Sequence, residues 1–156
     1  SETLDRNAKS DLCVASICSG IALANANLGA VHGFAGPIGG MIDAPHGALC
    51  GSLLLHVCRA NFDTATQRDP DGVVVRKFDE IALILTDNPA AKGTYAIAWL
   101  DALIKDLPLK PLSELGFDSD LIAEATDKAS RSSSMKGNPV ELSQADLREI
   151  LQAALI

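Results

Sequence analysis

Apolar residues recur at helical spacing in almost every segment of this sequence, and this periodicity argues against a sheet-based fold. The only run of β-branched residues is Val73-Val74-Val75, and no segment alternates apolar and polar residues for long. Predicted helices cover 4–28, 45–61, the region around 78–85, 90–107, a short stretch after Asp118 and a terminal stretch from Ser143. We therefore expect one all-α domain over residues 1–156, a bundle of about six to eight helices.

Two of the predicted helices carry apolar stripes that we expect to face other helices. The stripes are Cys13, Ile17, Ile21, Ala24 and Leu28 on the first, and Leu49, Leu53 and Val57 on the second. The polar residues 62–72, which end in Asp69-Pro70-Asp71-Gly72, predict a loop after the second helix.

The charge and hydropathy of the chain argue against two classes of partner. Thirteen Lys and Arg against twenty Asp and Glu give a net charge of -7, which repels nucleic-acid phosphates and anionic membrane surfaces. Apolar residues never run unbroken for the roughly 18 positions of a spanning helix. The cysteines lie in Ala- and Leu-rich segments, which predicts buried thiols in a reducing compartment. We expect a cytoplasmic protein that binds neither nucleic acid nor membrane.

All three histidines fall within one short segment, and two of them flank a stretch rich in chain-breaking residues. The seventeen residues that contain His32 and His46 include five glycines and two prolines. On one continuous helix the two histidines would lie about 21 Å apart, too far to share an ion. Gly39-Gly40 and Pro45 predict a reversal that brings the imidazoles together. Neutral imidazole is a common ligand of Fe²⁺ and Zn²⁺.

Spacing alone leaves two interpretations of these histidines. Histidines in a turn of this composition are more often structural than liganding, and a catalytic metal normally takes three or four protein ligands. Asp43 is a third candidate ligand, although an Asp just before Pro45 is more often a cap or turn residue. His56 lies ten residues beyond His46, about 15 Å along the same helix, so we expect it in the core or against a neighbouring helix instead.

Four motifs resemble the iron-containing (group III) alcohol dehydrogenase family. They are Leu28-Gly29-Ala30-Val31-His32-Gly33, Ala44-Pro45-His46-Gly47, Leu53-Leu54-Leu55-His56-Val57 with Asn61, and Gly137-Asn138-Pro139 before the terminal helix. The resemblance covers nearly the whole chain from about Ala8, and its specific part is 28–61. It implies the C-terminal metal-binding helical domain of the dehydroquinate synthase-like/iron alcohol dehydrogenase fold.

The resemblance also implies an activity, an NAD(P)-dependent and metal-dependent oxidation of alcohols or reduction of aldehydes. The family holds a divalent metal, Fe or Zn, with an Asp and a His four residues apart on one helix and with two later histidines. The later pair maps onto His32 and His46, which are thus the implied metal ligands. This sequence contains no Asp-x-x-x-His pair and no Gly-rich dinucleotide turn after a strand.

We therefore expect a chain that lacks the first two ligands and the N-terminal NAD(P)-binding α/β domain. The chain alone would then be inactive, with an incomplete metal site, no complete catalytic set and no NAD(P) site. The implied partners are a small alcohol or aldehyde substrate, the N-terminal nucleotide-binding domain and a second copy in a homodimer.

One position departs from the family pattern and keeps a second functional class open. Many members carry a histidine four residues after the first of the later pair, where this chain has Gly36, which cannot relay a proton. A stand-alone helical binding or scaffold domain that has lost the chemistry is the alternative. Phe34, Ile38 and Met41 are candidates for lining one wall of the cleft.

Overall fold

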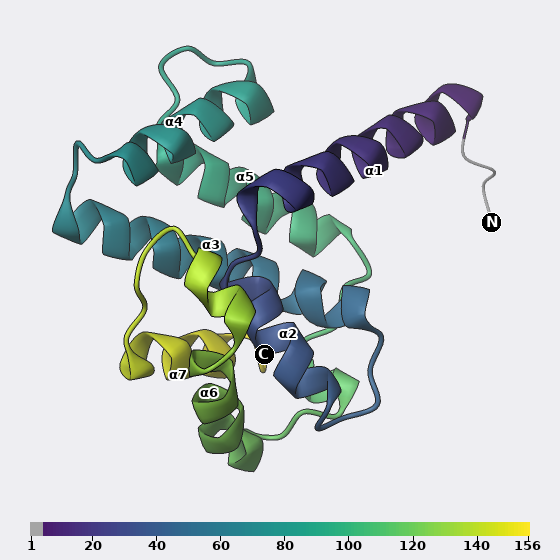
Figure 1. The fold of residues 1–156 in the computed structure, drawn as a ribbon. Helices are drawn as coiled ribbons and strands as arrows, with labels where there is room; N and C mark the ends of the chain where they lie inside the picture. The colour runs from purple at the N-terminus through teal and green to yellow at the C-terminus, as the bar shows by residue number, and fades with distance from the viewer. Residues whose placement is uncertain (1–4) are drawn as a thin grey trace.

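The computed structural model describes residues 5–156, which form seven α-helices and three short 3-10 helices (Figure 1). The α-helices are α1 (Arg6–Ala26), α2 (Ala30–Gly39), α3 (His46–Arg68), α4 (Val73–Thr86), α5 (Gly93–Asp106), α6 (Ile122–Ser130) and α7 (Gln144–Ala153). The 3-10 helices are η1 (Leu112–Leu115), η2 (Ser119–Leu121) and η3 (Ser133–Gly137). No strand occurs among the described residues, so the predicted all-α bundle is confirmed.

Helix α3 lies at the centre of the fold and contributes to two groups of buried side chains (Figure 1). The larger core lies between α2, α3, α6, α7 and η1, and the smaller between α3, α4 and α5. The stripe predicted on α3 is confirmed, since Leu49 and Leu53 are 0% exposed and Val57 is 2% exposed. Helices α2 and α3 both bury side chains in the larger core, and this packing fixes the position of one helix relative to the other. It therefore also fixes the separation of His32 on α2 and His46 on α3.

The loop predicted over residues 62–72 is largely wrong, because α3 continues to Arg68. Phe62 is buried and meets Phe78 of α4 edge-on, with 5.2 Å between ring centroids. A Cβ added at Gly93 would overlap the Phe62 ring, so α5 begins directly against this side chain. Residues 62–68 are mostly polar because only one face of this part of α3 is buried. That face packs against α4 and α5, which the local sequence pattern does not reveal.

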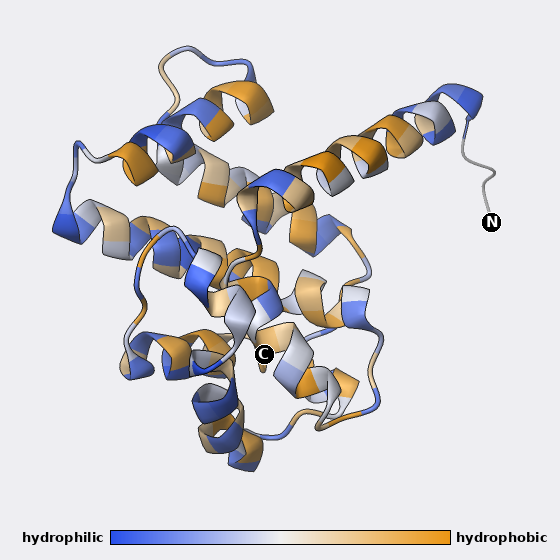
Figure 2. Ribbon diagram, in the orientation of Figure 1, coloured by the Kyte–Doolittle hydropathy of each residue, from blue (hydrophilic) through white to orange (hydrophobic). Residues whose placement is uncertain are grey.

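Helix α1 buries none of its residues. It is bent by 99° from α2 at a break where Asn27 adopts a φ of 63° and a ψ of -178°, which lie outside the helical region. Leu12, Val14, Ile17, Ile21 and Leu23 are 48–64% exposed, and in Figure 2 orange, hydrophobic positions recur along the ribbon of this projecting helix. Of the stripe predicted to face other helices, Cys13, Ile17, Ile21 and Ala24 are therefore exposed within residues 5–156, and Leu28 alone is half-buried. Apolar spacing indicates a face suited to burial, but it does not identify what covers that face.

No single helix in residues 5–156 is long and apolar enough to cross a bilayer. By length and composition, α1 and α2 meet that requirement only together, as the bent pair described above.

Asn138 ties the start of α2 to α3 and to the segment before α7. Its side-chain oxygen accepts hydrogen bonds from the Ala30 backbone N–H at 3.0 Å and from the Asn61 amide at 3.2 Å. Its own amide donates to the Asn61 side-chain oxygen at 2.7 Å and to the Val140 carbonyl at 2.8 Å. These bonds fix the first turn of α2 and thereby the position of His32.

The terminal helix begins as the sequence predicts. The Ser143 side chain accepts from the Asp146 backbone N–H, and the Asp146 carboxylate accepts from the Ser143 N–H, which makes a capping box. Asp118, by contrast, makes no side-chain cap hydrogen bond, and a 3-10 turn precedes α6 there.

Candidate metal centre

The first candidate ligand, His32, lies in the first turn of α2 and is half-buried. On the same helix Phe34 and Ile38 are fully buried in the larger core, and Met41 packs against that core beyond the helix end. The expectation that Phe34 and Ile38 line a cleft is therefore wrong, because the helical period that exposes His32 turns them inward.

The second candidate ligand, His46, is the first residue of α3 and is exposed. The chain reverses between the two helices, with hydrogen bonds from the Gly40 and Met41 N–H groups to the Pro37 and Ile38 carbonyls at 3.1 and 2.8 Å. Pro45 follows in extended conformation and precedes the helix. The ring centroids of His32 and His46 lie 5.4 Å apart with their planes at 47°. The predicted convergence of the two imidazoles is thus confirmed.

Cys50 adds a third donor, which the sequence did not predict. It lies one helical turn after His46, and its Sγ is 3.5 Å from His46 Nε2. One ligand atom from each of His32, His46 and Cys50 lies within 4.8 Å of the others. Asp43 is exposed and does not belong to this group. The four-residue spacing of His46 and Cys50 on one helix is the signal that would have identified it.

The prediction of buried cysteines is wrong. Cys13 and Cys18 are exposed on α1, Cys50 and Cys58 are half-buried on α3, and all four are free thiols. Partial burial raises the pKa of the Cys50 and Cys58 thiols above their ordinary value, because it disfavours the thiolate.

A groove of about 450 Å³ adjoins the candidate ligands. His32 and Cys50 line it together with apolar side chains that include Val31, Leu54 and Val57. Gly36, one turn after His32, is exposed, and a Cβ there would meet no atom within 4 Å other than its chain neighbours or helix backbone. The surroundings therefore offer space for a small, largely apolar molecule beside His32 and Cys50.

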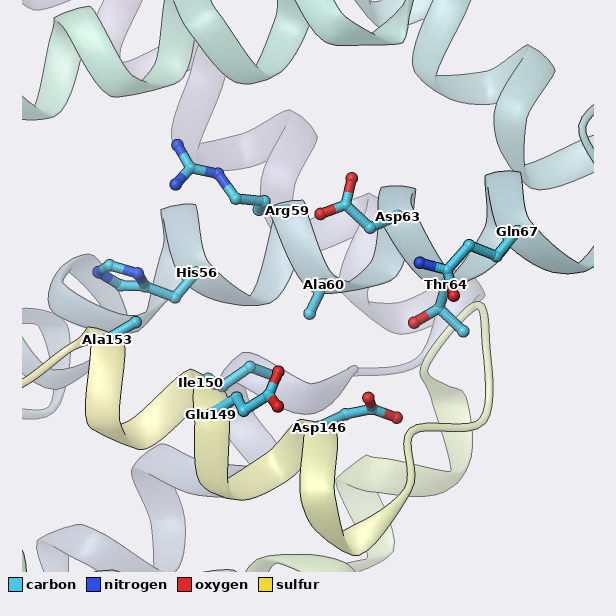
Figure 3. Close-up of a pocket in the computed structure, with 10 residues that line it drawn as sticks. All are labelled: His56, Arg59, Ala60, Asp63, Thr64, Gln67, Asp146, Glu149, Ile150 and Ala153. Atoms are coloured by element: carbon cyan, nitrogen blue, oxygen red, sulfur yellow. The ribbon is translucent and has the colours of Figure 1, made fainter.

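His56 does not join the group, in agreement with the expectation from its spacing. It lies half-buried at a separate hollow of about 280 Å³ between α3 and α7 (Figure 3). Arg59 and Asp63 of α3 and Asp146 and Glu149 of α7 line the same hollow. His56 is thus a helix-contact histidine in polar surroundings.

We expect His56 to titrate below its ordinary pKa of 6.5, because burial disfavours the imidazolium and Arg59 repels it, while Asp101 of α5 opposes both effects. The unfolded chain then binds this proton more readily than the folded chain. Stability from His56 is therefore complete above the unfolded pKa and is lost as the pH falls through the lower folded pKa. An NMR titration of the imidazole protons measures this pKa.

Arg59→Gln is the matched variant for that titration and should move the pKa of His56 upward. Asp146 and Glu149, which face the hollow from α7, stay unchanged in this variant. A pKa of His56 at or above the ordinary value in the unmodified chain would contradict the prediction.

Known proteins similar to this chain match it over nearly all its length. Residues 1–155 match the family model described as Fe-containing alcohol dehydrogenase family, C-terminal. Lactaldehyde reductase from Escherichia coli K12 is 29% identical over 153 residues, which are 96% of this chain and 38% of that protein. The 1,3-propanediol dehydrogenase of Citrobacter freundii is 31% identical over 155 residues, which cover 94% of this chain and 37% of that protein.

Solved structures show the same extent of similarity. A crystal structure of 1,3-propanediol oxidoreductase superposes with a TM-score of 0.77 at 29% identity, over 90% of this chain and 36% of that one. An alcohol dehydrogenase from Oenococcus oeni gives a TM-score of 0.72 at 28% identity, over 86% of this chain and 34% of that one. The chain therefore spans less than two fifths of the length of these relatives, and its fold is that of their helical part.

Proposed function

This chain belongs to the Fe-containing alcohol dehydrogenase family as its C-terminal domain, and on that premise we propose that it is the metal-bearing domain of an NAD(P)-dependent oxidoreductase. The observation that carries the proposal is the convergence of His32 and His46 from two helices, with ring centroids 5.4 Å apart. The names of two relatives, lactaldehyde reductase and 1,3-propanediol dehydrogenase, support a small alcohol or aldehyde as substrate.

His32 and His46 hold the divalent ion, Fe or Zn, as neutral imidazoles in this proposal. A tetrahedral ion with bonds of about 2.0–2.3 Å keeps its ligand atoms roughly 3.3–3.8 Å apart. The donors of the His32, His46 and Cys50 group lie within 4.8 Å of one another, about 1 Å above the upper end of this range, so small side-chain rotations would let them share one ion. When bound, such an ion supplies Lewis-acid polarisation of an alcohol or carbonyl oxygen.

The groove beside the histidines receives the substrate in this proposal. Val31, Leu54 and Val57 contribute apolar surface to it, which favours small carbon chains and displaces water. Gly36 leaves open space one turn after His32, so no side chain from this position orients the substrate or moves a proton.

This helical domain works with an α/β domain that binds NAD(P) and with the family's Asp and His ligands, which this chain does not contain. Two observations support this partner. The chain corresponds to 36–38% of the length of the enzymes it resembles. The apolar residues of α1, such as Ile17 and Ile21, are about 60% exposed, as expected for a face that another domain covers.

We expect His32→Ala and His46→Ala each to lower the Zn²⁺ affinity of the chain by roughly tenfold or more, because even neighbours that only orient a ligand contribute 10–100-fold. Isothermal titration calorimetry measures the affinity. His56→Ala is the matched control, since His56 lies outside the group and should leave the affinity unchanged.

Two outcomes would count against the proposal. An unchanged Zn²⁺ affinity in both His32→Ala and His46→Ala would show that neither histidine is a metal ligand. No Zn²⁺ binding by the unmodified chain would instead support the alternative, a helical scaffold domain without the chemistry, which Gly36 also favours.

A further inference from the structure

We propose that Cys50 is a third protein ligand of the metal, bound through a thiolate beside His32 and His46. The inference rests on the proposed function, in that the two histidines hold the ion. Cys50 follows His46 by one turn of α3, so both side chains project from one face of that helix. The His32 ring reaches the same point from α2.

The spacing of the donors fits shared coordination. A nitrogen and a sulfur bound to one tetrahedral ion at about 2.05 and 2.3 Å lie about 3.6 Å apart. The distance between His46 Nε2 and Cys50 Sγ is 3.5 Å. A Cys50 thiol that donates a weak hydrogen bond to His46 Nε2 would also give this distance. The two arrangements differ when a metal ion is added, because only a liganding Cys50 forms a metal–thiolate bond.

Position separates Cys50 from the other thiols. Cys58 lies two turns further along α3 and lines the same groove, but it does not belong to the group of three donors. Cys13 and Cys18 are exposed on α1 and also lie outside it. Cys50 is half-buried beside His32, which limits its exposure to solvent while it still faces the groove.

Binding through sulfur changes which metal the site prefers. The thiol proton leaves to solvent as the metal–sulfur bond forms, so the thiolate offsets one of the two positive charges of the ion. Thiolate is a soft ligand and favours Zn²⁺ over harder ions such as Mg²⁺ and Mn²⁺. The softness of the thiolate thus favours zinc over harder ions at this site.

Cobalt substitution tests the inference, because Co²⁺ replaces Zn²⁺ and a cobalt–thiolate bond gives a charge-transfer band in the near ultraviolet. The parent is the full 156-residue chain with Cys13→Ser and Cys18→Ser, which removes the exposed thiols. We expect the parent to show the charge-transfer band together with visible ligand-field bands. Cys50→Ser should lose the charge-transfer band, keep the ligand-field bands and bind Zn²⁺ roughly tenfold or more weakly.

Cys58→Ser is the matched control and should retain the full spectrum, and circular dichroism verifies that each variant is folded. A charge-transfer band that persists in Cys50→Ser, or bound Co²⁺ without that band in the parent, would overturn the inference and leave the histidine site intact. If His32→Ala no longer bound Co²⁺ while Cys50→Ser kept the charge-transfer band, the Cys50 inference would likewise be overturned and the histidine site would stand. Failure of the parent to bind Co²⁺ at all would overturn the inference, because three protein ligands within this chain should hold the ion without the remaining family ligands.

Discussion

Phe34→Ala is expected to destabilise the protein by about 3–5 kcal/mol, the usual cost of removing a buried aromatic ring. Phe34 is 0% exposed and packs in the larger core from the inner face of α2. The cavity left by the ring would remain lined by side chains of α3, α6 and α7, whose positions are fixed by their own packing. Equilibrium unfolding in urea, followed by circular dichroism, measures the change.

Phe34→Leu is the conservative control and should cost much less, because it keeps most of the buried volume. A loss below about 1 kcal/mol for Phe34→Ala would show that α2 does not pack on the core in solution. Since His32 lies two residues away on the same helix, that outcome would also remove the support for its position.

Gly137→Ala is expected to cost about 3 kcal/mol or more, because the added methyl group would overlap a backbone atom that cannot rotate away. A Cβ at Gly137 would overlap the carbonyl oxygen of Leu28 and lie 3.1 Å from the Cβ of Asn27. The segment before α7 would have to move off the start of α2. That movement also breaks the hydrogen bonds of Asn138 to Ala30 and Asn61, each of which contributes about 1 kcal/mol.

Gly47→Ala is the matched control, since a Cβ at this position in the first turn of α3 would meet nothing within 4 Å. Alanine favours the helix over glycine by up to about 1 kcal/mol, so this variant should be neutral or slightly more stable. Thermal unfolding of the two variants side by side gives the comparison. Equal melting temperatures for both variants would contradict the close approach of the two backbones.

Local pattern predicted a helix in the region of each described α-helix except α2, whose glycines and Pro37 are typical of a turn. Tertiary packing decided where the predicted helices end. The stripe Leu49, Leu53 and Val57 identifies a helix because its spacing is a property of the segment itself. The extension of α3 past Phe62 is not evident from the sequence, since residues 62–68 are mostly polar and their one buried face depends on Phe78 and Gly93.

In the candidate site too, the sequence predicts some features and only the fold shows the others. The breakers Gly39-Gly40 and Pro45 predict the reversal, and the reversal brings His32 and His46 together. Cys50 was missed because cysteine in an Ala- and Leu-rich segment usually indicates burial, and only the direction of its side chain reveals the contact with His46. Gly36 is evident from the sequence as a departure from the family, but the open space around it is visible only in the fold.

The projecting helix α1 has one chemical consequence for work with this protein. Both of its thiols, Cys13 and Cys18, lie on a segment from which no side chain enters the core. An alkylating reagent or a fluorescent label attached to either sulfur would displace no packed atom. Covalent tagging of α1 therefore leaves the packing of helices α2 to α7 undisturbed.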